Sequence, residues 1–162
     1  MELSPPILYE AGLVSALQWL GRWMQEKCNM TIHLAIEQDV DLENEDLRVL
    51  TFQSVRELLF NTMKYAGVKE AHVQLRQPDE AHLQIIVADR GKGFDVEQAH
   101  KEQHEGGGFG LFSIRQRLEV MGGEMDIWSQ PGKGTRTTLL VPFRRRLPGS
   151  HTTSKGTRIA DE

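Results

Sequence analysis

The stretch IIVADRGKGFD, residues 85–95, combines a run of apolar residues with an acid and two glycines. Four apolar residues lead directly to Asp89, and two glycines, Gly91 and Gly93, follow with one lysine between them. The apolar run is typical of a buried strand that ends at the acidic residue. Glycine permits positive φ and the close approach of a flat or phosphorylated ligand. Two interpretations are open: Asp89 presents a carboxylate to a ligand, or it caps a simple turn.

Other segments of the chain predict the sheet and helices around this strand. Apolar and polar alternation, bounded by turn residues such as QPDE and QPGKG, predicts strands over residues 30–37, 71–76, 82–89, 124–129 and 135–141. Helical spacing predicts helices over residues 10–27, 47–66 and 111–121, and residues 90–108 are predicted as loop. Strands that are mostly sequential, with helices between them, predict an α+β fold. We expect a two-layer α/β sandwich with helices on one face of a mixed, mainly antiparallel sheet.

Composition restricts the class of protein. The chain has 162 residues, of which 39% are hydrophobic and 26% are charged, as expected for one globular domain. No run approaches the roughly 18 apolar residues that a membrane span needs. Cys28 is the single cysteine, which excludes an internal disulfide framework and a cysteine-built metal site. These features favour a reducing cytoplasm.

Charge is unevenly distributed along the chain. Residues 144–162 hold five Lys/Arg and two acidic residues, so the overall net charge of −4 leaves −7 for the rest. An acidic body argues against nucleic acid as a partner. The basic, polar segment after Pro142, residues 143–162, is predicted to be a disordered tail.

A second candidate site is the helix segment ELLFNTMKYAG, residues 57–67. One predicted side of this helix is mostly apolar and consists of Val55, Leu59, Thr62, Met63 and Ala66. The opposite side has Glu57, Asn61 and Lys64 at spacings of four and three. An acid, an amide and an ammonium thus share one face. On spacing alone, a solvated helix face is favoured over a site.

A third candidate is GGGFGLFSIRQRLEVMGG, residues 106–123, where glycines run directly into a predicted helix. The free N–H groups and the dipole at a helix N-terminus favour an anion such as phosphate. A flexible hinge is the alternative. Because Gly91 and Gly93 lie upstream, two glycine hinges would bound one charged loop that could close over a ligand.

Together these three segments resemble the ATP-binding domain shared by sensor histidine kinases, DNA gyrase, heat-shock chaperones and mismatch-repair ATPases. ELLFNTMKYAG is similar to the N box, Glu-x-x-x-Asn-x-x-Lys-His/Tyr-Ala, and DRGKGFD to the first glycine box, Asp-x-Gly-x-Gly-Phe. The third segment resembles the second glycine box, followed by Gly-x-Gly-Thr at residues 132–135. The similarity covers residues 51–142 and implies the Bergerat-type ATP-binding fold.

Two details resemble the histidine kinase branch. One is GLFSIRQR, residues 110–117, together with the final Gly-Thr strand, and the other is the opening LSPPILYEAGLVSALQWL, residues 3–20. The opening is similar to the junction between dimerisation and catalytic domains in kinases that partner LuxR-type response regulators. The resemblance divides the chain into the end of a dimerisation helix and junction (residues 1–9), a catalytic domain (residues 10–142) and the tail (residues 143–162).

The chain has no counterpart of the phospho-accepting histidine. His33, His72 and His82 fall in predicted strands, whereas His100 and His104 fall in the predicted lid loop, residues 95–107. The resemblance therefore implies an acceptor histidine on a separate dimerisation domain of the same kinase and relay to a response regulator. It also implies a monomeric fragment of a homodimeric parent, cytoplasmic in location, whose parent could still be anchored to a membrane.

On the adenine side, the resemblance implies that Asp89 accepts a hydrogen bond from the amino group of ATP. Thr135 would support this contact through its hydroxyl group or a water. Gly91 and Gly93 would let the chain pass close to the nucleotide, and Phe94 belongs to the same box.

On the phosphate side, Asn61 would be the protein ligand of Mg²⁺ and Glu57 would hold a metal-bound water. Lys64 would neutralise the phosphates. The remaining implied nucleotide contacts are Tyr65 and the backbone of Gly108, Gly110 and Leu111. The residue after the N-box asparagine varies in the family, so no role is expected for Thr62.

Two other functions share these boxes: a serine kinase of the anti-sigma type and a plain ATPase or nucleotide-sensing module. The LSPPIL junction argues against both, because neither needs the end of a dimerisation helix.

Overall fold

The computed structural model describes residues 4–104 and 110–143. Its helices are α1 (Pro6–Ala11), α2 (Leu13–Cys28), α3 (Glu45–Asn61), α4 (Val96–His104) and α5 (Gly110–Val120), and a π-helical turn, η1 (Thr62–Ala66), continues α3. Its strands are β1 (Thr31–Ile36), β2 (Glu70–Arg76), β3 (His82–Asp89), β4 (Glu124–Ser129) and β5 (Thr135–Pro142). Of the predicted tail only Phe143 is described; it packs against the core and its backbone N–H donates to the carbonyl of Ala81.

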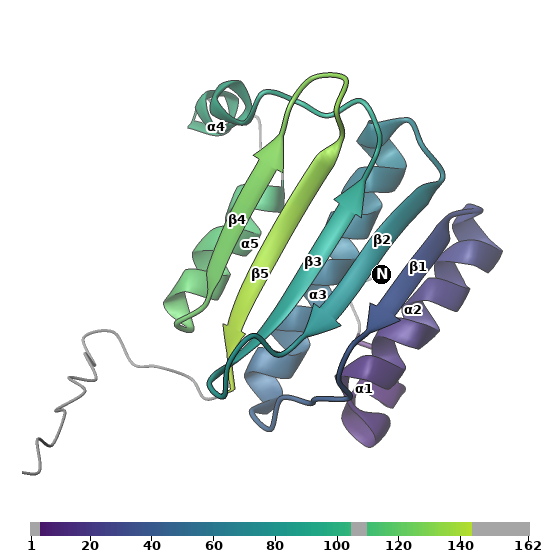
Figure 1. Ribbon diagram of the computed structural model, residues 1–162, viewed down its shortest axis with the longest axis vertical. Helices are drawn as coiled ribbons and strands as arrows, with labels where there is room; N and C mark the ends of the chain where they lie inside the picture. Colours follow the sequence, from purple (N-terminus) through teal and green to yellow (C-terminus); the bar gives the residue numbers. More distant parts are fainter. Residues whose placement is uncertain (1–3, 105–109, 144–162) are drawn as a thin grey trace, which may run out of the picture.

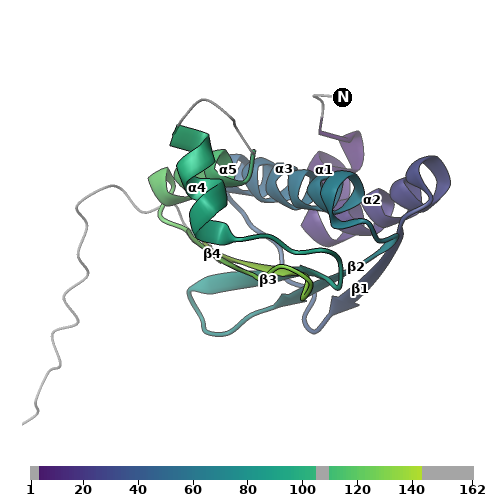
Figure 2. The same ribbon diagram turned by 90° about the horizontal axis from the view of Figure 1, so that it is seen from above.

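The strands form one five-stranded sheet in the order β1-β2-β3-β5-β4. β1 pairs with β2 in parallel, and every other pairing is antiparallel. Figures 1 and 2 show the helices gathered over one face of this sheet. The predicted α+β class, with helices on one face of a mixed, mainly antiparallel sheet, is confirmed.

The core lies between the sheet and the helices. On β3, Leu83, Ile85 and Val87 are buried at every second position, so one face of the central strand is apolar. Phe52 and Leu59 of α3 are also buried and belong to the same cluster. In the described ranges, no helix is both long enough and apolar enough to cross a membrane.

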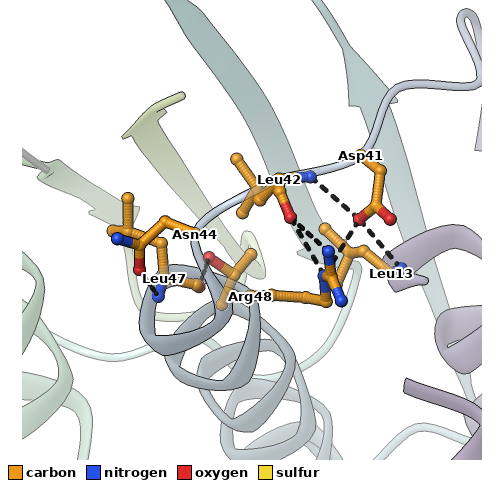
Figure 3. Close-up of polar contacts among 7 residues, drawn as sticks. Leu13, Asp41, Leu42, Asn44, Leu47 and Arg48 are labelled. Atoms are coloured by element: carbon orange, nitrogen blue, oxygen red, sulfur yellow. Dashed lines mark hydrogen bonds and ion pairs between the residues drawn. The ribbon is translucent and has the colours of Figure 1, made fainter. Parts of the chain in front are cut away.

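The single helix predicted over residues 10–27 is in fact two helices that meet at Gly12. Gly12 has φ +89°, and a Cβ there would collide with the Asp41 carboxylate. Asp41 Oδ1 accepts hydrogen bonds from the backbone N–H of Leu13 (3.2 Å) and of Leu42 (2.8 Å), as Figure 3 shows. Arg48 of α3 lies 3.4 Å from the same oxygen and donates twice to the Leu42 carbonyl. The helix is therefore interrupted at Gly12, where a carboxylate from the loop between β1 and α3 accepts from the free N–H of Leu13.

The loop predicted over residues 90–108 was wrong in its central part, which forms α4. Asp95 Oδ1 accepts from the backbone N–H of Gln98 at 3.0 Å, so Asp95 caps the first turn of the helix. Ala99 is buried, and the His100 ring packs edge-on against Phe112 of α5, with centroids 5.0 Å apart. A charged segment thus forms a helix because one side of it packs against the domain.

Candidate functional site

A cavity of about 320 Å³ lies between the end of α3, the turn η1, strands β3 and β5, and helices α4 and α5. It is lined by Leu58, Asn61, Thr62, Tyr65, Ala66, Val87, Asp89, Gly93, Phe94, Asp95, Gln98, Ala99, Glu102, Leu111, Thr135 and Thr137. Seven of the predicted site residues lie on its wall, namely Asn61, Tyr65, Asp89, Gly93, Phe94, Leu111 and Thr135. Mostly apolar walls with a few convergent polar groups are typical of a pocket for a small ligand.

Asp89 lies at the end of β3, where the apolar run of the strand delivers its carboxylate to the cavity. Oδ1 accepts from the backbone N–H of Gly91 at 2.8 Å. Oδ2 lies 3.3 Å from the hydroxyl of Thr62, which also lies 3.2 Å from the Leu58 carbonyl. Thr62 is buried and lines the cavity, a position at the site that was not expected from the sequence. The Gly91 N–H thus holds Oδ1, while the single proton of the Thr62 hydroxyl is shared between Oδ2 and the Leu58 carbonyl.

Thr135 is the direct neighbour of Asp89 across the β3–β5 pairing. Its hydroxyl lies 2.9 Å from the hydroxyl of Ser129, which accepts from the backbone N–H of Phe94 at 2.9 Å. Ser129 also donates to the Gly134 carbonyl at 2.9 Å. Ser129 was not predicted as a site residue. Its place at the end of β4, five residues before Gly134, could have suggested a hydrogen bond across the β4–β5 turn.

The glycines of the loop allow protein backbones to approach one another closely. A Cβ at Gly91 would collide with the carbonyl oxygen of Ala66, and one at Gly93 with the carbonyl oxygen of Gln130. Gly93 has φ +62° and also lines the cavity. The contacts that require glycine here are with η1 and with the β4–β5 turn, and these contacts shape the cavity wall.

Of the three residues predicted to share one polar helix face, Glu57 and Asn61 lie on α3 and Lys64 lies on η1. Asn61 is half-buried and lines the cavity, whereas Lys64 is exposed on η1 and does not line it. Tyr65 lines the cavity although its side chain is 57% exposed. The π-helical turn begins directly after Asn61, and such turns are frequent at functional sites. It ends at Gly67, with φ +72°, as the sequence predicted.

Glu57 lies beside the start of α5. A Cβ at Gly110, the first residue of α5, would lie 2.6 Å from Glu57 Oε1. A carboxylate at this position is favoured by the helix dipole. Leu111 is buried and lines the cavity, whereas Gly108 falls outside the described residues. In the part of the chain that is described, no group of three or more His, Cys, Asp or Glu side chains could hold a metal ion.

Several wall residues were not predicted from the sequence. Gln98, Ala99 and Glu102 come from α4, which was expected to be loop, and Thr137 is a buried threonine of β5. The alternation of β5 places Thr135 and Thr137 on the same side of the strand, and this signal could have found the second threonine.

Comparison with known proteins identifies the group to which this chain is related. Residues 46–145 match the model of the family described as histidine kinase-, DNA gyrase B- and HSP90-like ATPase. An uncharacterized sensor-like histidine kinase of Chloroflexus aurantiacus is 33% identical over 145 residues, which is 88% of this chain. The chain spans about a quarter of the length of that relative (24%).

Solved structures share the fold. The histidine kinase domain of the blue-light activated histidine kinase of Erythrobacter litoralis EL346 has a TM-score of 0.63 at 20% identity, covering 81% of this chain and 61% of that one. A second structure of that kinase has a TM-score of 0.62 at 21% identity, covering 81% of this chain and 42% of the other. The chain therefore belongs to the histidine kinase-, DNA gyrase B- and HSP90-like ATPase family, as a domain of the histidine kinase type.

Proposed function

We propose that this chain is the ATP-binding catalytic domain of a two-component sensor histidine kinase. It binds ATP with Mg²⁺ and transfers the γ-phosphoryl group to a histidine on a separate dimerisation domain, for relay to a response regulator. The observation that carries the proposal is the Asp89 carboxylate, which faces an apolar cavity next to Thr135. Asn61 lies on the wall of the same cavity.

Adenine recognition follows from the groups on the cavity wall. Adenine has two apolar faces and an exocyclic amine, so it suits a pocket whose walls are apolar and whose polar end has an acceptor. Asp89 accepts from Gly91 on Oδ1, and its remaining lone pairs are available to the amine. A carboxylate acceptor gives a stronger hydrogen bond than a neutral group would.

The side chains near Asn61 fit a magnesium ion bound mainly by the nucleotide. Asn61 and Glu57 are one helical turn apart on α3, and they offer an amide oxygen and a carboxylate. Asn61 would be the direct ligand and Glu57 would orient a metal-bound water. When bound, Mg²⁺ would neutralise charge on the phosphates. Lys64 and the backbone N–H groups of Gly108, Gly110 and Leu111 would hold the phosphates at the start of α5.

None of these residues needs to form a covalent bond during phosphoryl transfer. A ring nitrogen of the acceptor histidine bonds to the γ-phosphorus while the bond to the bridging oxygen breaks, and ADP leaves. Catalysis consists mainly of positioning and charge stabilisation. Within the described part of the chain, His33, His72 and His82 lie on strands, whereas His100 and His104 lie on α4, and this supports an acceptor on another domain.

The parent kinase would be a homodimer, since the proposed acceptor domain is a dimerisation domain. The LSPPIL segment and the sensor-like relative support a histidine acceptor over the serine acceptor of an anti-sigma-type kinase. The same segment supports a LuxR-type response regulator as the final acceptor. We further propose that this domain acts in the cytoplasm and that residues 1–9, 10–142 and 143–162 are junction, catalytic domain and tail.

Transfer of radiolabelled γ-phosphate from ATP to the separately produced dimerisation domain of the parent kinase tests the proposal. We expect wild type to give an acid-labile, base-stable label on the acceptor and none on itself. Asn61→Ala should abolish transfer without unfolding the domain, because Asn61 is outside the apolar core. Gln53→Ala, on the same helix but away from the cavity, is the matched control.

Transfer at the wild-type rate by Asn61→Ala would show that Asn61 is only a surface residue. ATP hydrolysis without any transfer would support a plain ATPase instead.

A further inference from the structure

Ser129 joins three parts of the site through one hydroxyl group. It is buried at the end of β4, and its oxygen lies 2.9 Å from each of three partners: the Phe94 backbone nitrogen, the Gly134 carbonyl oxygen and Thr135 Oγ1. Phe94 belongs to the loop after β3, whereas Gly134 and Thr135 lead into β5. Ser129 itself does not line the cavity, but Phe94 and Thr135 do.

The direction of these hydrogen bonds can be deduced from the chemistry of the partners. A hydroxyl group has one proton to donate and two lone pairs. The Phe94 N–H can only donate, so it uses one lone pair of Ser129. The Gly134 carbonyl can only accept, so Ser129 donates its proton to Gly134. Its second lone pair is then satisfied only if Thr135 donates to it. The proton of Thr135 therefore points to Ser129, and its lone pairs remain for the cavity.

We propose that Ser129 is a positioning residue for base selection, because it fixes the Thr135 hydroxyl as a hydrogen-bond acceptor. This inference rests on the proposed binding of ATP. Asp89 and Thr135 are paired across β3 and β5, so the cavity offers two adjacent acceptors. An exocyclic amine has two N–H groups and suits such a pair. A carbonyl at the same position would meet only acceptors, and an unpaired buried acceptor is costly.

The test compares the affinities of ATP and of inosine triphosphate, which has a carbonyl where ATP has the amine. In Ser129→Ala the Thr135 proton is free to turn toward the cavity. We expect the preference for ATP over inosine triphosphate to fall about five-fold, the size of one neutral hydrogen bond. Ser129→Cys replaces the hydroxyl group by a somewhat larger thiol, which is a much weaker acceptor, and should narrow the preference similarly without leaving a cavity. Ser54→Ala removes another buried serine, one that only donates to the Leu50 carbonyl within α3, and should leave the preference unchanged.

A double-mutant cycle with Thr135→Val distinguishes two roles of Ser129: orienting the Thr135 hydroxyl, or only holding the loops at Phe94 and Gly134 in place. Where Thr135 has no hydroxyl, Ser129→Ala should no longer change the preference. The proposal would be overturned if Ser129→Ala weakened both nucleotides equally, or if the change persisted in the Thr135→Val background. Failure of wild type to bind ATP at all would refute the proposed function instead, so the two failures are distinguishable.

Discussion

At the scale of single residues, the side chain of Asp89 is held by contacts within the folded chain. Oδ1 accepts from the Gly91 N–H and Oδ2 lies next to the Thr62 hydroxyl, so the carboxylate has little freedom to rotate. Part of the ordering cost of recognition is therefore already met by the folded chain. The sequence could predict the acid at the strand end, but Thr62 comes from another element and only the tertiary structure brings its hydroxyl to Asp89. Ser129 likewise reaches Thr135 and Phe94 only in the folded chain.

Replacing Asp89 by asparagine should reverse the polarity at this point of the cavity. The Gly91 N–H still needs an acceptor, so the amide oxygen should take the place of Oδ1 and the NH₂ group should take the place of Oδ2. We expect Asp89→Asn to weaken ATP binding by about 2 kcal/mol, the range for a lost hydrogen bond to a charged group, and to narrow the gap to GTP. Displacement of a fluorescent ATP analogue by ATP and by GTP measures both affinities.

Asp126→Asn, an exposed acid on β4, is the control and should change neither affinity. If Asp89→Asn also left both unchanged, Asp89 would be only a loop cap.

Two glycines of the β4–β5 turn have the same backbone conformation but different surroundings. Gly132 and Gly134 both have φ +80°, yet a Cβ at Gly132 would meet nothing within 4 Å. A Cβ at Gly134 would collide with the Asp89 carbonyl oxygen. Gly132→Ala should cost about 1 kcal/mol of unfolding free energy through backbone strain alone. Gly134→Ala should cost roughly 2 kcal/mol more through overpacking, and should weaken ATP binding.

Urea denaturation of the two variants gives both unfolding free energies. If the two variants lost the same amount of unfolding free energy, this would contradict the close packing of Gly134 against Asp89 of β3.

At the scale of elements, apolar periodicity was sufficient to predict the five strands and the main helices. It failed where a long-range contact decides the local structure. The helix break at Gly12 depends on the Asp41 carboxylate, 29 residues further along the chain. Helix α4 depends on the packing of Ala99 and of His100 against the rest of the domain, within a segment whose composition indicates loop. The π-helical turn after Asn61 leaves no pattern in the sequence that predicts it.

The contact between Asp41 and the start of α2 can be tested independently of the cavity. Asp41→Ala removes the acceptor of the Leu13 N–H and the partner of Arg48 (Figure 3). Because Asp41 is partly exposed, we expect a loss of about 1 kcal/mol, which lowers the melting temperature by roughly 2–4 °C in a domain of this size. ATP affinity should stay unchanged, because Asp41 is not among the residues that line the cavity.

Asp39→Ala, in the same loop and exposed, should change the melting temperature by much less. Equal melting temperatures for the two variants would show that the contact does not hold the junction.

At the scale of the whole molecule, the helices cover one face of the five-stranded sheet. α3 crosses the middle of this layer, while α4 lies near the end of the sheet where β3 and β4 end (Figures 1 and 2). The cavity lies at this end and is lined from α3, β3, α4 and β5 together, so no single element forms the site. The family of the chain could be expected from its three motifs, but the shape of the cavity could not, because α4 contributes one of its walls.

Base selection by the cavity can be measured by calorimetric titration of the wild-type chain with ATP and then with GTP, both in excess Mg²⁺. We expect one ATP bound per chain and GTP at least roughly tenfold weaker, because a carbonyl would face the acceptors Asp89 and Thr135. Equal affinity for the two nucleotides, or no heat of binding with ATP, would contradict this expectation.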